Sequence, residues 1–471
     1  MSGLAGGEVQ EMIATASNSL GVEFHLPLLR VTRQTAVFES YDLAVVLRTS
    51  EVLSPFQIKL RDEVIYSGKA VVRNLVSTGF ATVCELTLEE SGWQSAPIST
   101  GGLQAKDVTA RFAGFVESWK RFHQVRPEMK IVVADLQSFL TQLRIWTEQL
   151  EFELRGVKAS ERLLAEKQIA EQLGNSAFPF LDELFDQLER TASRFGEELE
   201  PMHAEFVRRQ IHPLILCSPF ADRTVHKPLG YAGDYEVVNM ILRDPHEGSS
   251  LYARLINRWF IKQPPAEAHR NRVHYLSRRL LEEAARCSVN SKPTRIFNLG
   301  CGPAKEIQDF MTEQAVSNHA EFTLLDFNEE TVTHSRSVLE SVRNRNNRKT
   351  VLNFQKKSVA QVLRTRDTDA AGYDMVYCAG LFDYLSDAVC VRLMNIFYDM
   401  LAPGGLLLVT NVDSGNPIRH WLEDVLDWHL IYRDGAGMRA LKPERASIDD
   451  MTVCADYTGV NLFLEVRKPL T

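Results

Sequence analysis

A glycine-rich turn at residues 300–304 is the part of this sequence best suited to bind a ligand. The apolar run Ile296–Leu299 is typical of a buried parallel strand, and a helix-like segment, Lys305–Met311, follows the turn. Because glycine lacks a Cβ, Gly300 and Gly302 allow backbone N–H groups to approach a ligand at a helix N-terminus. Many strand-to-helix turns need glycine for steric reasons alone, so the turn by itself leaves a nucleotide-type ligand and a structural role both open.

A carboxylate follows the next apolar run. Residues 322–325 end in Asp326, which can accept hydrogen bonds from both hydroxyls of a ribose if it stands at the carboxyl end of a strand. A dinucleotide fold would want a third glycine where Lys305 stands. A ligand made of adenosine and an amino acid, without phosphates, makes no such demand.

The same alternation of strand-like and helix-like runs continues to the C-terminus, which predicts a doubly wound α/β domain. The run 351–354 precedes Ser358 and Val359, and the run Tyr373–Cys378 ends in Ala379 and Gly380. The turn Leu401–Gly405 then leads into an apolar strand at 406–409. Ligands of open α/β sheets bind at the carboxyl ends of the strands, where these polar and small residues gather.

The succession of GCGPA (300–304), Asp326 and LAPGG (401–405) resembles the class I S-adenosylmethionine-dependent methyltransferases over about residues 290–471. Ala304 stands where a third glycine is common in that family. The resemblance implies that S-adenosyl-L-methionine is the cofactor, with its methionine part on the glycine turn, its ribose on Asp326 and its adenine on Phe327. The cofactor-binding residues that it implies are Tyr235, Asn298, Gly300, Cys301, Gly302, Pro303, Asp326, Phe327, Ser358, Val359, Cys378, Ala379 and Gly380.

A second unusual segment precedes this region. Residues 226–239 combine a histidine, two tyrosines, Asp234 and two glycines, Gly230 and Gly233. The glycines predict a loop of unusual backbone shape, and Asp234 can cap the helix that follows. A capped helix start accounts for Asp234 but needs fewer polar and aromatic residues than this segment has. The segment is therefore also expected to line a ligand site.

A narrower resemblance rests on four segments: KPLGYAGDYE (227–236), NLGCGPAKE (298–306), CAGLFDYLSD (378–387) and DWHLIYRD (427–434). Together they resemble bacterial 3-hydroxypalmitic acid methyl ester synthases, which make a quorum-sensing signal, over roughly residues 200–471. This resemblance implies O-methylation of a carboxylate such as a 3-hydroxy fatty acid. Two alternatives stay open: methylation of an amine or N-hydroxy metabolite at N or O, and a non-catalytic protein that senses the cofactor.

The acceptor decides which side chains the chemistry needs. A carboxylate is already ionised and needs no general base, whereas an amine or hydroxyl must lose a proton. Arg433 can anchor an anionic acceptor, and Tyr231 and Asp234 are the first candidates for positioning either substrate. The candidate catalytic residues are Tyr231, Asp234, Asp383, Tyr384, Asn411 and Arg433.

The composition limits the class of protein. A chain of 471 residues with 45% hydrophobic and 24% charged content predicts two to four globular domains. The net charge of −8 argues against a nucleic-acid partner. Seven cysteines without a CxxC pair suit reduced thiols and give no metal site. Without a signal sequence or an apolar run of about 18 residues, the chain is expected to be cytoplasmic, with no integral membrane segment.

The N-terminal region predicts a small β-barrel. Six short strand-like runs lie at 35–38, 43–47, 56–60, 64–66, 69–75 and 81–88. Their spacing and the turn Asn74–Gly79 resemble the PilZ fold. PilZ domains that bind cyclic di-GMP carry RxxxR and [DN]xSxxG motifs, but Arg30-Val-Thr-Arg33 is one residue short and the second motif is displaced. A barrel used for packing or dimerisation is therefore favoured over a nucleotide sensor.

From about Asp107 to Ile211 the apolar residues recur with helical period, and Gly174 and Pro179 predict a turn between helices. A possible homodimer would use the barrel or this bundle, and the acceptor is a small molecule. We therefore expect five regions: a flexible arm at 1–22, a PilZ-like barrel at 23–100, a helical bundle at 103–212, a helical lid with the active-site loop at 213–290, and the methyltransferase domain at 291–471.

Overall fold

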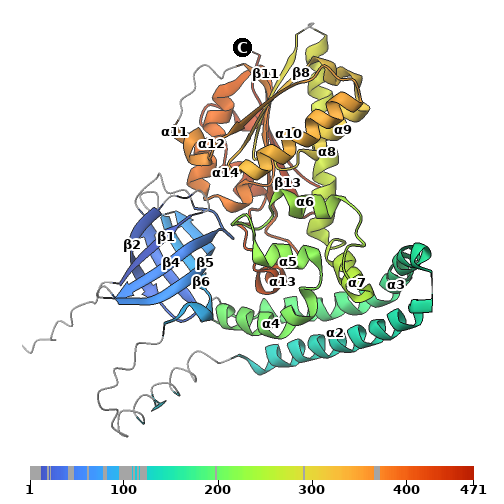
Figure 1. Ribbon diagram of the computed structural model, residues 1–471. Coiled ribbons are helices and arrows are strands. Elements are labelled where there is room, and N and C mark those ends of the chain that lie inside the picture. The colour runs from blue at the N-terminus through green and yellow to red at the C-terminus, as the bar shows by residue number, and fades with distance from the viewer. Residues whose placement is uncertain are drawn as a thin grey trace, which may run out of the picture.

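The N-terminal part of the protein is a closed six-stranded barrel (Figure 1). The computed structural model describes residues 12–18, 21, 23–40, 47–60, 63–77, 82–94, 109, 112, 113, 116, 125–156, 158–196, 199–289, 292–364 and 372–470. The strands follow the order β1-β2-β3-β6-β5-β4. Their bounds are β1 Met12–Ser17, β2 Glu23–Val31, β3 Thr35–Ser40, β4 Val52–Leu60, β5 Glu63–Ser77 and β6 Thr82–Leu88. Alternate side chains such as Phe38, Phe56 and Tyr66 fill the interior.

The barrel differs from the predicted one in which segments form its strands. β1 lies in the region expected to be a flexible arm, and its Ala14 and Ala16 are small enough to face the crowded interior. The runs 64–66 and 69–75 form one strand, β5, because Gly68 lets the chain continue close to Tyr66 and Gly92 instead of turning. Residues 43–46 of the predicted strand 43–47 lie outside the described residues.

Three long helices follow the barrel: α2 Pro127–Glu153, α3 Ala159–Ala192 and α4 Glu200–Ile215. The predicted break at Gly174 and Pro179 is wrong, since α3 runs through both residues. The guanidinium of Arg258 donates to the carbonyls of Ala170 and Glu171, and a Cβ at Gly174 would lie 2.2 Å from its Nη1. Gly174 therefore makes room for an arginine from another helix, and the packing of α3 outweighs the proline's local preference.

Shorter helices connect this bundle to the C-terminal domain: α5 Pro219–His226, α6 Tyr235–Leu242, α7 Leu251–Phe260 and α8 Pro264–Ser288. α7 and α8 are separated near Gln263-Pro264-Pro265, and α8 begins at Pro264 because proline is accepted in the first turn of a helix. Helices α2 to α7 share one hydrophobic core with α13 Arg419–Leu426, centred on Phe185, Trp259 and Trp421. The helical segment is thus packed into the rest of the protein.

The C-terminal domain is a seven-stranded sheet of order β12-β13-β11-β10-β7-β8-β9. Strands β11, β10, β7, β8 and β9 are parallel, and β13 and β12 are antiparallel additions at one edge. The bounds are β7 Thr294–Leu299, β8 Ala320–Asp326, β9 Val351–Lys356, β10 Tyr373–Cys378, β11 Leu401–Val412, β12 Met451–Ala455 and β13 Asn461–Arg467. The predicted doubly wound α/β fold is confirmed.

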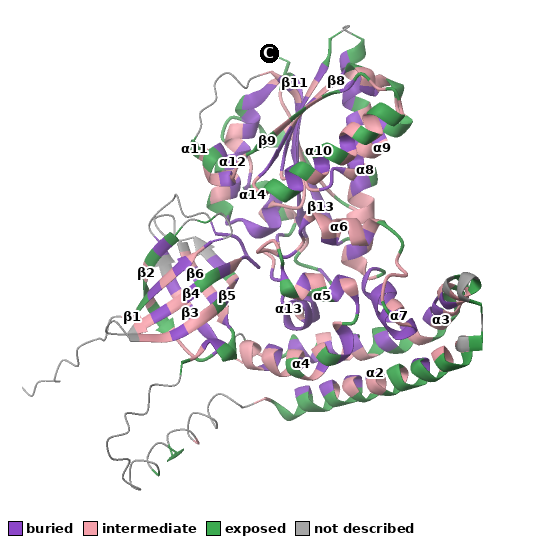
Figure 2. Cartoon of the chain, viewed as in Figure 1, coloured by how far each residue is buried: buried purple, intermediate pink, exposed green. Residues whose placement is uncertain are grey.

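Helices cover both faces of this sheet, so its central strands are buried (Figures 1 and 2). One face packs against α8, α9 and α10, and the other against α11, α12 and α14. These helices are α9 Lys305–Glu313, α10 Glu329–Arg345, α11 Val359–Arg364, α12 Asp387–Met400 and α14 Gly435–Ala440. Among the described residues, no helix has the length and apolar character needed to cross a membrane.

Candidate functional site

The sheet changes direction of winding between β7 and β10, and the main pocket of the protein lies at the carboxyl ends of these two strands. The pocket encloses about 1200 Å³, including the part open to solvent. It is lined by Arg48, Tyr231, Gly233, Tyr235, Val238, His269, Arg272, Val273, Leu276, Asn298–Glu306, Asp326, Phe327, Lys357, Val359, Tyr377, Ala379, Gly380, Leu381, Asp383, Tyr384, Val412, Trp428 and Leu430.

The glycine turn forms one wall of this pocket. Gly300 and Gly302 have φ of 72° and 50°, in the region that favours glycine. The N–H groups of Gly300 and Cys301 both donate to Leu325 O, at 2.8 and 3.1 Å, which fixes the turn to β8. A Cβ built on Gly302 would meet no atom within 4 Å, so its bare backbone faces open space. A ligand can therefore contact the main chain there.

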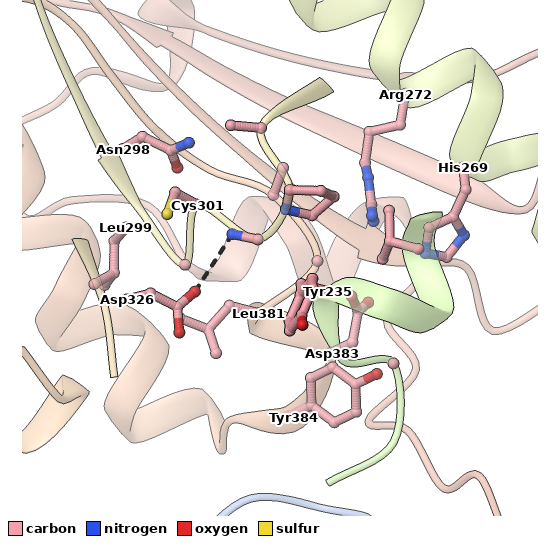
Figure 3. Close-up of a pocket in the computed structure, with 18 of the residues that line it drawn as sticks. Tyr235, His269, Arg272, Asn298, Leu299, Cys301, Asp326, Leu381, Asp383 and Tyr384 are labelled. Carbon is pink, nitrogen blue, oxygen red and sulfur yellow. Dashed lines mark hydrogen bonds between the residues drawn. The ribbon is translucent and has the colours of Figure 1, made fainter. Parts of the chain in front are cut away.

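Asp326 ends β8 on the same side of the pocket (Figure 3). Its carboxylate accepts hydrogen bonds from the N–H of Asn328 at 3.0 Å and of Gly302 at 3.3 Å. Burial raises the pKa of Asp326, and these two N–H groups oppose that shift. The turn and the strand end therefore hold an oriented, buried carboxylate at the pocket surface.

Polar groups behind the glycine turn favour a cation. Glu306, in the first turn of α9, is buried and accepts a hydrogen bond from Tyr377 Oη at 2.7 Å. Burial raises its pKa, and the Tyr377 hydroxyl opposes the shift. The buried Oδ1 of Asn298 has no hydrogen-bond partner among the described residues. An ammonium group at this position would supply the missing donor.

Helix α8 contributes the opposite charge. Arg272 and His269 extend from α8 into the pocket (Figure 3). A Cβ at Gly380 would lie 2.8 Å from Arg272 Nη1, so the absence of a side chain there lets the guanidinium approach the end of β10. The carboxylates of Asp383 and Glu306 attract this guanidinium, but no described residue accepts a hydrogen bond from it, so its N–H groups can bind an anion. His269 Nδ1 donates to Pro265 O at 2.9 Å, and burial lowers the pKa of His269 to about 3, so the ring is neutral.

The loop at 227–236 covers one side of the pocket. Gly230 and Gly233 have φ of 83° and 69°, which confirms the predicted unusual backbone. Tyr231 packs against Phe327 with ring centroids 5.0 Å apart. Asp234 caps α6 by accepting from the N–H groups of Glu236 and Val237, and also binds Arg223 through both oxygens. Its carboxylate is engaged by these groups and does not line the pocket, so Asp234 holds the loop and the start of α6 in place.

A hydrogen-bonded aromatic pair forms the far wall. Trp428 Nε1 donates to Tyr384 Oη at 2.9 Å, and burial raises the pKa of Tyr384. Since this oxygen accepts from the indole, the tyrosine proton remains available to a ligand. Asp383, beside it, accepts from the N–H of Val412 at 2.6 Å. A Cβ on Gly233 would lie 2.5 Å from Tyr384 Oη, so the loop at 227–236 meets this wall closely.

The structure separates the predicted site residues into two groups. Tyr231, Tyr235, Asn298, Gly300, Cys301, Gly302, Pro303, Asp326, Phe327, Val359, Ala379, Gly380, Asp383 and Tyr384 line the main pocket. Asp234, Ser358, Cys378, Asn411 and Arg433 do not line it. Arg433 is buried and donates to Asn411 Oδ1, to two backbone carbonyls and to Asp387. Arg433 and Asn411 therefore stabilise the chain next to Asp383. An anion anchor at Arg433 is not compatible with these contacts.

Sequence reasoning missed several pocket residues. His269 and Arg272 lie on one face of α8 with Val273 and Leu276, a helical spacing within an arginine-rich stretch that offered a weak signal. Glu306 lies two residues after the glycine turn, and this position was the signal that could have identified it. Arg48 comes from the barrel, and nothing in its local sequence points to a site whose other residues begin only at Tyr231.

Residues 290–442 match the family described as "Methyltransferase domain". No curated protein matches the chain. Similar solved structures include a possible exported protein from Bordetella parapertussis, with 18% identity, a TM-score of 0.41, and coverage of 53% of this chain and 86% of the other. Another is the magnesium protoporphyrin IX methyltransferase of Synechocystis PCC 6803 with bound S-adenosylhomocysteine, with 12% identity, a TM-score of 0.35, and coverage of 56% and 99%. An O-methyltransferase family protein from Burkholderia thailandensis shows 13% identity, a TM-score of 0.31, and coverage of 50% and 68%.

The sheet order, the pocket at its switch point and the match over residues 290–442 agree with one another. The C-terminal part of the chain has the Rossmann-like fold of a methyltransferase domain, for which S-adenosyl-L-methionine is the expected cofactor.

Proposed function

We propose that the protein binds S-adenosyl-L-methionine in the main pocket and methylates a small molecule, most simply a carboxylate such as a 3-hydroxy fatty acid, to give a methyl ester. The observation that carries the donor part is the distribution of charge around the glycine turn. Asp326 suits the ribose hydroxyls, and Phe327 with Val359 suits the adenine ring. This is the arrangement that the sequence resemblance implies.

The charges near the turn suit the methionine part of the donor. The guanidinium of Arg272 lines the pocket with no hydrogen-bond acceptor among the described residues, which fits the donor carboxylate. Glu306 and the unpartnered Oδ1 of Asn298 fit its ammonium group. A cationic and an anionic group in the same pocket as the bare glycine backbone match an amino acid zwitterion.

The observation that carries the acceptor part is a second cavity, which we call the apolar cavity. It shares His269 and Trp428 with the main pocket. Apart from His269 and Gln263 its lining is apolar, and consists of Phe220, Ile241, Phe260, Pro265, Ala266, Ile418, Trp421, Leu422, Leu426 and Trp428. An alkyl chain buried there would gain roughly 0.8 kcal/mol per methylene, whereas a polar metabolite would lose hydrogen bonds to water.

A surface groove lies next to the apolar cavity. A groove lined by residues of α3, α7 and α13 shares Gln263, Ile418 and Trp421 with it. Phe178, Phe185 and Trp259 add aromatic surface to this groove. The succession of main pocket, apolar cavity and groove, each sharing residues with the next, supports the proposal of a fatty acid over a compact metabolite.

The residues of the main pocket suit transfer to a carboxylate. When bound, the donor supplies a methyl group on a sulfonium, which a nucleophilic oxygen takes while the C–S electron pair returns to sulfur. Tyr384, kept neutral by burial, donates its remaining proton to one oxygen of the acceptor and so directs the other. Trp428 fixes the orientation of that hydroxyl. Alignment of this kind can contribute up to about 7–11 kcal/mol, and no proton has to be removed.

An amine or hydroxyl acceptor is less well served. His269 is the neutral base nearest the apolar cavity, but burial lowers its pKa to about 3, so it binds a proton weakly. Asp383 is held by the N–H of Val412. Burial raises the pKa of Asp383, but the N–H of Val412 already occupies its Oδ1, and His269 is not matched to proton removal near neutral pH.

The test uses methyl-labelled S-adenosyl-L-methionine, the purified full chain, and saturated and 3-hydroxylated fatty acids of increasing length. Mild alkali distinguishes the products, because a methyl ester releases its label as volatile methanol and an N-methyl group or methyl ether does not. We expect alkali-labile label that increases with chain length. Ala266→Phe, which fills the apolar cavity, should shift the preference to shorter acids.

A matched control is Ala436→Phe, at the exposed start of α14 away from both cavities. It should leave chain-length preference unchanged. Alkali-stable label from a metabolite extract would replace the ester proposal with an N- or O-methyltransferase of another acceptor. Tight binding of S-adenosylhomocysteine without transfer to any acceptor would favour a protein that senses the cofactor.

A further inference from the structure

A turn of the N-terminal barrel is buried against the main pocket. Residues 47–51 precede β4, and the exposed fractions of Arg48, Ser50 and Glu51 are 5%, 0% and 0%. The turn is tightly held: Arg48 N donates to Glu51 Oε2 at 2.9 Å, and Ser50 N donates to Val72 O at 2.6 Å. Ser50 has φ of 58°, so the backbone is held in an unusual shape by its surroundings.

The turn contacts three segments of the pocket wall. Thr49 N donates to Tyr384 O at 3.2 Å, and Val52 N donates to Gly230 O at 2.7 Å. Ser50 Oγ accepts from His429 N at 2.6 Å and donates to His429 O at 2.9 Å. These buried polar groups form hydrogen bonds with one another across the interface. Without the turn, the buried groups of the pocket wall would lose their hydrogen-bond partners.

The side chain of Arg48 reaches into the main pocket. Its Cζ lies 3.8 Å from the ring centroid of Phe327 and 4.9 Å from that of Tyr231. Its charge opposes the effect of burial on the pKa of Asp326. Glu51 Oε2 lies 3.6 Å from Arg48 Nε and steadies the stem of the side chain. The guanidinium is therefore placed beside both residues that we assign to the adenosine part of the donor.

We infer that Arg48 is a binding residue for the adenosine part of the donor, so that the barrel supplies one wall of the donor site. This inference rests on the proposed function. A guanidinium is a planar cation that stacks on aromatic rings and donates several hydrogen bonds in its plane. Adenosine offers an aromatic face, ring nitrogens that accept, and ribose oxygens that accept. Arg48, which lies over the ring of Phe327 and whose charge acts on Asp326, matches that combination.

The test is titration of the full chain with S-adenosylhomocysteine by calorimetry, for the wild type, Arg48→Met and Arg48→Lys. Arg48→Met should weaken binding by at least about tenfold, the loss expected for a hydrogen bond to a charged group. Arg48→Lys, which keeps the charge but not the plane, should fall between the two. Arg30→Met is the matched control, because Arg30 lies on the same barrel with a side chain 64% exposed.

Two readouts separate ligand contact from a structural role. Adenosine alone should show the same relative loss with Arg48→Met, whereas a merely structural role would lower the melting temperature of the ligand-free protein and leave the affinity intact. Equal affinity of wild type and Arg48→Met for S-adenosylhomocysteine would overturn the inference.

Hydrogen exchange of the wild-type protein decides the matter if Arg48→Met does not fold. S-adenosylhomocysteine should slow exchange at the amides of residues 47–53 as well as at 326–331, and unchanged exchange at 47–53 alone would overturn the inference. If the wild type binds no S-adenosylhomocysteine at all, the proposed function fails and the inference fails with it.

Discussion

Replacing Asp326 with asparagine tests the donor site most directly. The change removes one negative charge and keeps the shape of the side chain. Asparagine Oδ1 can still accept from Asn328 N, but its amide nitrogen would face Gly302 N, where a second donor cannot be accepted. The ligand-free fold should tolerate this, because burial raises the pKa of Asp326 and the ionised carboxylate therefore already costs stability.

The expected loss of donor affinity follows from the hydrogen bonds to ribose. Hydrogen bonds to a charged group contribute roughly 1.5–3 kcal/mol each, and neutral ones roughly 0.5–1.5 kcal/mol. Two ribose hydroxyls that lose a charged partner should therefore lose about 2–3 kcal/mol in total, which is about a 30- to 150-fold rise in the dissociation constant. Calorimetric titration with S-adenosylhomocysteine measures this value.

The pH dependence gives a second, independent readout. The donor requires the ionised carboxylate, so affinity should be full above the pKa of Asp326 and fall as the pH drops through it. Because this pKa is raised, the fall should begin at a higher pH than for an ordinary aspartate, and Asp326→Asn should abolish it. Glu321→Gln, at the other end of β8, is the control and should change neither quantity. Unchanged affinity in Asp326→Asn would refute the assignment of the pocket.

Three further changes test the acceptor wall and the packing behind it. Tyr384→Phe should lower kcat by at least about tenfold, because it removes the proton offered to the acceptor and the oxygen that accepts from Trp428 Nε1. The affinity for S-adenosylhomocysteine should be unchanged, and a matching loss of donor affinity would contradict the role of Tyr384. Gly233→Ala should destabilise the protein by about 1–3 kcal/mol more than Gly459→Ala in denaturant titrations, because both residues have positive φ but only the Cβ at 233 would meet Tyr384 Oη. Burial raises the pKa of Asp424 to about 8, so folding takes up a proton and stability should fall as the pH rises from about 4 to 8, by up to about 1.4 kcal/mol per pH unit. Asp424→Asn should remove that slope, measured as the difference in unfolding free energy between pH 5 and pH 8.

The sequence predicted the site best where neighbouring residues determine both the backbone shape and the ligand contacts. A strand followed by a glycine turn, and a second strand that ends in Asp326, need only a few adjacent residues to be recognised. The parallel order of the sheet then places the turn and Asp326 side by side. The unusual backbone of the loop at 227–236 could be predicted for the same reason. Gly230, Gly233 and the cap at Asp234 determine the shape of their own segment.

The sequence was least informative where distant segments decide the outcome. In the sequence Gly174 predicts a helix break. In the structure it lies inside a helix, because Arg258 of another helix occupies the space beside it. In the sequence Arg433 was a candidate anion anchor. In the structure its guanidinium instead binds Asn411 and two backbone carbonyls. Arg48 had no local signal, because its role depends on how the barrel packs against Phe327.

The two halves of the site are therefore encoded in different ways. The donor half is built from strand ends and turns, whose backbone geometry leaves few residue types possible. The apolar cavity is built from helix faces, with Phe260, Trp421 and Leu426 belonging at the same time to the hydrophobic core of the helical segment. In a sequence such residues cannot be told apart from core, because both show the same helical periodicity. Acceptor specificity can then change through substitutions that look like ordinary repacking, while the donor motifs stay the same.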